Sequence, residues 1–110
     1  MQAANFYFDD PQATLTEIES FAQVTPEDVQ RQFEKREVAL QEAIQRIDSQ
    51  LLKYKTTVPR LFMLEVEHNR AVLRAELEWL HGVIEDFRIG ELFWNEEWIR
   101  EIAERLKSQE

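Results

Sequence analysis

The amino-acid sequence predicts an all-α protein built on a long antiparallel helix hairpin, with a short helix near each end of the chain. Two long stretches repeat apolar residues at spacings of three and four, which keeps those side chains on one face of a helix. A short segment that contains Pro59 joins the two stretches, so the second helix folds back on the first. Helix-start signals near residues 10, 25 and 95 complete the pattern.

The first long helix is expected to run from about Pro26 to about Tyr54. Thr25 can cap its amino end, where Pro26 suits the first turn, and the acids that follow suit the positive end of the helix dipole. Glu37 interrupts the apolar seam, which is otherwise formed by Phe33, Leu40, Ile44, Ile47, Leu51 and Tyr54.

The second long helix is expected from about Arg60 to about Arg88, ending before Gly90 at a position that favours glycine. Gly82 lies inside this helix and costs about 1 kcal/mol relative to alanine. Either a close approach of another helix or simple tolerance explains it. The apolar positions are Phe62, Val66, Val72, Leu73, Leu77, Leu80, Ile84 and Phe87.

Each end of the chain has a weaker signal of its own. Phe6, Tyr7 and Phe8 suit a short extended arm, and Asp10 followed by proline marks the start of a short helix. Asn95 caps a last amphipathic helix. We therefore divide the chain into an arm with a short helix at 1–24 and a helical body at 25–110.

Composition limits the functions that this chain can have. It has 110 residues, a formal net charge of −9 and no cysteine. An acidic surface repels phosphate, so nucleic-acid binding by these residues is not expected. No apolar run reaches the length of a membrane span, and the amino end does not resemble a signal peptide. The lack of cysteine fits a reducing compartment, and we expect a cytoplasmic protein without membrane contact.

Residues that could carry chemistry are few, and we expect no enzyme, no cofactor and no metal. No serine lies in a glycine-rich turn that would support nucleophilic catalysis. Two Glu-x-x-His motifs, at 65–68 and 78–81, resemble ligand pairs of metal-binding bundles. They lie about 20 Å apart along one helix and point about 220° apart around it, so they cannot face one core.

The tryptophans offer a candidate ligand pocket, formed by Trp79, Trp94 and Trp98, for a flat hydrophobic molecule. The competing interpretation, which we favour, is that these large side chains fill the core or an interface.

A lone hairpin leaves one side of its apolar seam exposed to water, so we expect two copies to pair as a homodimer with a four-helix core. The sequence does not separate contacts within one chain from contacts between chains. The candidate interface residues are Leu40, Ile44, Ile47, Leu51, Tyr54, Leu73, Leu77, Leu80 and Ile84.

The run from Leu64 to Leu80, which ends in Glu-Trp-Leu, resembles the C-terminal region of PadR-like transcriptional regulators, also called the virulence-activator alpha C-terminal domain. The stretches at 25–29, 36–40 and 95–99 are similar to other parts of that region. The resemblance implies a dimerisation domain that positions two winged-helix domains on operator DNA, and these winged helices are missing from this chain. It also implies a small aromatic effector as a candidate ligand. A stand-alone helical interaction protein and a small-molecule-sensing bundle remain the alternatives.

Overall fold

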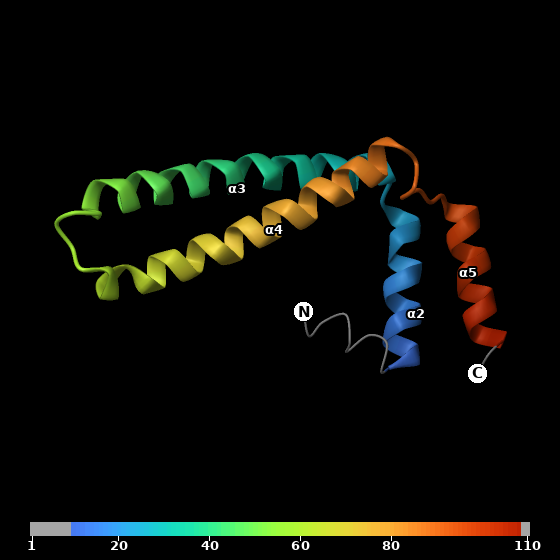
Figure 1. Cartoon of the computed structure of the whole chain (residues 1–110). Helices are drawn as coiled ribbons and strands as arrows, with labels where there is room; N and C mark the ends of the chain where they lie inside the picture. Colours follow the sequence, from blue (N-terminus) through green and yellow to red (C-terminus); the bar gives the residue numbers. More distant parts are fainter. Residues whose placement is uncertain (1–9, 109–110) are drawn as a thin grey trace. The chain divides into compact units, whose positions relative to one another are not determined.

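The computed structural model describes residues 10–108, and every regular element in that range is helical. The chain forms α2 (Pro11–Ser20), α3 (Pro26–Tyr54), α4 (Leu64–Arg88) and α5 (Glu96–Ser108), with short 3-10 segments at Phe21–Gln23 and Arg60–Met63 (Figure 1). The all-α prediction is confirmed. The arm expected at Phe6–Phe8 lies outside the described residues.

The helices group into two compact units. One unit, Gln30–Glu91, contains most of the hairpin of α3 and α4, and the other joins residues 10–29 with residues 92–108. In the second unit α2 packs against α5. This grouping differs from the division after residue 24 that the sequence suggests, because the packing of α2 on α5 joins the two ends of the chain. No local pattern reveals such a pairing.

The helix ends lie where the capping residues predict them. The Asp10 side chain accepts hydrogen bonds from the amides of Gln12 and Ala13, and the Thr25 hydroxyl accepts one from the Asp28 amide at 3.1 Å. The Asn95 side chain caps α5 in the same way. Each cap satisfies amide groups that a helix cannot satisfy internally.

The carboxyl end of α4 also follows the prediction. Gly90 has φ 85°, a left-handed conformation that costs glycine little, and its amide donates to the carbonyl of Phe87. The start of this helix differs, because α4 begins at Leu64 and not at Arg60. After Pro59 the chain first makes a 3-10 turn, in which the Phe62 amide donates to the Pro59 carbonyl at 3.0 Å.

The hairpin core is small and lies between α3 and α4. Leu40, Leu80 and Ile84 are each 1% exposed, and Phe33, Leu73 and Leu77 pack against them. The edge of the Phe33 ring contacts Phe87, with ring centroids 6.0 Å apart. These contacts hold the open end of the hairpin together, opposite the 55–59 loop.

The unit of terminal helices has its own core. Leu15 of α2 and Ile99 and Ala103 of α5 are buried in this unit, in which the two helices pack together, and Trp94 is also buried. The Trp94 indole N–H donates to the carbonyls of Phe21 and Val24, both at 3.0 Å. The 3-10 turn after α2 is thereby joined to the segment before α5.

Candidate association surface

The residues predicted for an interface between copies serve mainly within one chain. Five of them are buried in the hairpin of the single chain: Leu40, Ile44, Ile47, Leu80 and Ile84. Three more, Leu51, Leu73 and Leu77, are half-buried, and Tyr54 is exposed. The structure thus places the centre of the seam in the contact between α3 and α4 of one chain.

The predicted tryptophan cluster is divided between the two units. Trp79 lies in the hairpin, while Trp94 and Trp98 lie in the unit of terminal helices. Trp94 is a core residue with its ring edge on Phe21, at 5.3 Å between centroids. Trp79 and Trp98 are largely exposed. Packing therefore accounts for Trp94. The Trp79 ring also meets Phe33 of α3, with centroids 6.3 Å apart, and the part of Trp79 that stays exposed is a candidate for contact with another molecule.

The histidine of the second Glu-x-x-His motif has its partner on the other helix of the hairpin. The His81 ring nitrogen Nε2 lies 2.9 Å from a carboxylate oxygen of Glu37 on α3, a pairing across the hairpin. Glu37, the polar break in the seam, is thus matched by a histidine on the opposite helix. Within the described residues, no group of three or more His, Asp or Glu side chains is gathered closely enough to hold a metal ion.

Charged pairs along the hairpin align α3 with α4. Arg36 binds Glu76 through two hydrogen bonds of 2.8 Å, and these bonds hold the pKa of Glu76 below its ordinary value of 4.5. Arg70 likewise binds Asp48 and lowers the pKa of that carboxyl. Exposed pairs of this kind add little stability, but they favour one alignment of the helices. The sequence pattern does not reveal these pairs because each joins residues far apart in the chain.

The outer faces of the two helices differ in character. On α3, the face turned away from the core is polar, and its exposed positions at helical spacing are Arg31, Lys35, Val38, Glu42, Gln45, Ser49 and Lys53. We define the outer face of α4 as Leu64, His68, Val72, Ala75, Trp79, Gly82 and Asp86, which are all exposed. Leu64 is 45%, Val72 51% and Trp79 61% exposed. The apolar members of this face are interspersed with His68, Gly82 and Asp86. Exposed apolar side chains at helical spacing are typical of a contact site.

Gly82 lies within the outer face of α4. A Cβ atom added there would have no heavy atom within 4 Å, apart from the neighbouring backbone of its own helix. The close approach that could explain this glycine is therefore not made by any described residue of the same chain. At a cost of about 1 kcal/mol relative to alanine, the glycine leaves open space on this face of the helix.

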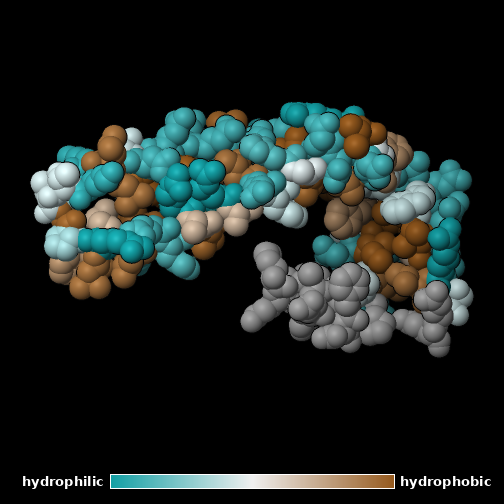
Figure 2. Space-filling model, viewed as in Figure 1, coloured by the Kyte–Doolittle hydropathy of each residue, from teal (hydrophilic) through white to brown (hydrophobic). Residues whose placement is uncertain are grey.

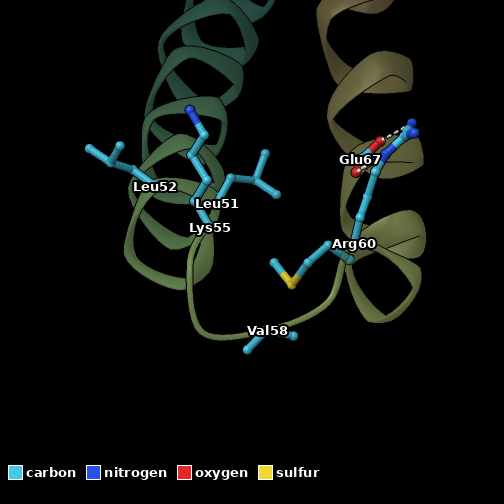
Figure 3. A pocket seen from close by; sticks show the side chains of 7 residues that line it. Leu51, Leu52, Lys55, Val58, Arg60 and Glu67 are labelled. Atoms are coloured by element: carbon cyan, nitrogen blue, oxygen red, sulfur yellow. Dashed lines mark hydrogen bonds and ion pairs between the residues drawn. The ribbon is translucent and has the colours of Figure 1, made fainter.

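The loop end of the hairpin is apolar and basic. Figure 2 shows hydrophobic side chains gathered at this end, where Leu52, Leu61 and Phe62 are at least 70% exposed. A groove of about 480 Å³ opens between the helices and is lined by Leu51 and Met63, among others, with Val58 at its base (Figure 3). Lys55 lies at its rim on the α3 side. The Arg60 guanidinium, by contrast, pairs with Glu67.

No helix in the described part of the chain combines the length and the apolar content that a membrane span requires. Comparison of the chain with models of protein families, with curated proteins and with solved structures finds no match.

Proposed function

We propose that this chain is an association module that pairs with a second copy of itself through the outer face of α4. The observation that supports the proposal is the contrast between the two helices of the hairpin. Both bury one face in the shared core, but only α4 carries a second apolar stripe, with Val72 and Trp79 more than half exposed. Removing such a stripe from water is the usual driving force of helix association.

In this proposal the pair serves as the dimerisation domain of a PadR-like transcriptional regulator. The resemblance of residues 64–80 to that family supports this role, and those residues include most of the outer face of α4. The described residues form no winged helix. Operator DNA would be bound by domains outside these 110 residues, and pairing would set the distance between two such domains to match two half-sites.

The acidic charge of the chain fits a role in pairing better than a role in DNA binding. With a net charge of −9, the chain has 22 acidic residues against 13 basic ones. Such a surface favours solubility and opposes contact with phosphates. Contact with an apolar helix face needs no net positive charge.

Sedimentation equilibrium at micromolar concentration tests the proposal, with a matched pair of variants. The expected mass is twice the 13.2 kDa of one chain. Val72→Glu places a carboxylate in the proposed interface, and we expect it to sediment as a single chain. Val38→Glu is the control, because Val38 is equally exposed at 51% but lies on the polar face of α3. A 13.2 kDa mass for the unmodified chain would refute the proposal.

A further inference from the structure

We infer that the two copies pair with α4 antiparallel to its counterpart, about a two-fold axis level with residue 77. The inference rests on the proposed pairing through the outer face of α4 and adds its direction and register. It also assigns a partner to the basic loop end of the hairpin, which is the acidic carboxyl end of α4 in the second copy.

The order of large and small residues along the outer face fits this register. Its residues follow one another at spacings of four, four, three, four, three and four, from Leu64 to Asp86. A two-fold axis level with residue 77 places each residue of one copy opposite the residue of the second copy that is equally far beyond 77, so the two residue numbers add up to 154. Trp79 then faces Ala75 of the second copy, and Val72 faces Gly82. Each large side chain meets a small one, which allows close packing of two helices.

A parallel pairing would place each residue opposite its own copy. Two Trp79 rings would meet at one level, and two glycines would leave a gap about one turn away. A parallel pair would therefore overpack the two large tryptophans and leave the two glycines without van der Waals contact. The exposed space beside Gly82 therefore favours an antiparallel partner that brings the Val72 side chain to it.

Charge along the hairpin points to the same direction. Residues 49–76 carry five Lys or Arg against three Asp or Glu, with Arg60 and Arg70 paired to Glu67 and Asp48 of the same chain, whereas residues 78–91 carry one Arg against four acids. An antiparallel pair places the positive part of each copy beside the negative part of the other, while a parallel pair aligns like charges. On the outer face itself, His68 comes level with Asp86 of the second copy, since 68 and 86 add up to 154.

The exposed apolar residues near the ends of α4 also come together in this register. Leu64 lies level with the turn after α4 of the second copy, where Ile89 is 62% exposed. Lys53 and Lys55 belong to the same end of the hairpin as Leu64, and Glu85 and Glu91 flank Ile89 in the sequence. An apolar contact rimmed by opposite charges is typical of a specific interface.

Cysteine cross-linking tests the direction of pairing, and the natural chain is suitable because it has no cysteine. The variants are His68→Cys and Asp86→Cys, both at exposed positions. A short bismaleimide should cross-link the two variants when they are mixed, and neither variant when it is alone. In the antiparallel register two copies of residue 68 lie about 27 Å apart along the axis, given 18 residues at 1.5 Å each. Circular dichroism confirms that both variants remain helical.

The outcomes separate this inference from the proposed function. Cross-linking of the His68→Cys variant alone would show a parallel dimer, which overturns the register and leaves the pairing intact. A dimeric mass without any of these cross-links would show that another surface is used. A chain that remains monomeric but sediments with vesicles of phosphatidylcholine and phosphatidylglycerol would assign the basic loop end to a membrane and overturn both proposals.

Charge reversal gives an independent readout. His68→Glu alone places two acids together at each of the two equivalent contacts, and Asp86→Lys alone removes the favourable pairing. We expect the first to weaken the dimer about tenfold and the double variant to restore the dissociation constant to within about twofold. Glu42→Lys, on the polar face of α3, is the control and should leave it unchanged. Equal effects of the single and double variants would refute the facing of 68 and 86.

Discussion

Gly82→Ala is the most informative single substitution, because it should raise the stability of the folded chain and weaken the association of two chains. In a single chain the added methyl group meets no atom within 4 Å, and alanine is about 1 kcal/mol more favourable than glycine inside a helix. The thermal midpoint of the monomer should therefore rise by about 4 °C. In the pair, by contrast, the methyl group enters the space that Val72 of the second copy fills.

The cost to pairing follows from the symmetry of the dimer. Each dimer contains two equivalent contacts of Gly82 with Val72, and overpacking at about 1 kcal/mol for each gives about 2 kcal/mol. The dissociation constant should rise about thirtyfold. Sedimentation equilibrium over a concentration series measures this change. Thermal unfolding, followed by circular dichroism at a concentration where the chain is monomeric, measures the stabilisation.

Gly90→Ala is the matched control for this substitution. It makes the same chemical change, but at φ 85°, where a side chain is strained, so the monomer should lose about 1 kcal/mol of stability. If Gly82→Ala raises the thermal midpoint and leaves the dissociation constant unchanged, the outer face of α4 is not buried on association. The reasoning about this glycine would then be refuted.

Three further predictions concern the folded chain itself. Leu40→Ala removes a side chain that is 1% exposed and should lower the free energy of unfolding by about 2–5 kcal/mol, measured by urea denaturation; a loss below about 1 kcal/mol would place Leu40 outside the core. Trp94→Phe keeps an aromatic ring but removes the indole donor of the Val24 and Phe21 carbonyls, of which only Phe21 retains another donor, the Val24 amide; it should cost about 1–3 kcal/mol, and unchanged stability would show that water replaces the indole. Because Arg36 lowers the pKa of Glu76 below 4.5, this pair stabilises the fold above that pH and its contribution is lost as the pH falls further. In the Glu76→Gln variant, the free energy of unfolding measured by urea denaturation should therefore fall less steeply with decreasing pH below 4.5. The same pH dependence as in the natural chain would contradict the assignment.

The sequence alone predicts the helices of this protein well because the signals are local. Asp10, Thr25 and Asn95 each stand at a helix start and make the expected capping bonds, and Gly90 ends α4 in the expected conformation. These signals depend on residues within three or four positions of one another. The 3-10 turn at Arg60–Met63 is a small exception, since the apolar pattern does not distinguish its spacing from that of an α-helix.

The sequence could not show which apolar residues meet within one chain and which remain exposed. Leu80 and Trp79 are adjacent and both apolar, yet one is 1% and the other 61% exposed. The difference depends on where α3 lies, which is a long-range property. The favoured interpretation of Trp94 as a core or interface residue agrees with its burial, but the sequence could not give its partners, because Phe21 and Val24 lie some seventy residues earlier.

The two hydrogen bonds from the Trp94 indole N–H to the carbonyls of Phe21 and Val24 have a consequence for the order of folding. These bonds span 73 and 70 positions of the chain, so an unfolded chain must close a very long loop before it can make them. The hairpin can form first, because its helices are joined by a five-residue turn and can pair from that turn towards the contacts Leu40–Leu80 and Phe33–Phe87. Once it has formed, the loop that the Trp94 hydrogen bonds must close is shorter. The termini should therefore assemble last and come apart first, and hydrogen exchange should find the amides of α2 and α5 opening well before those of α3.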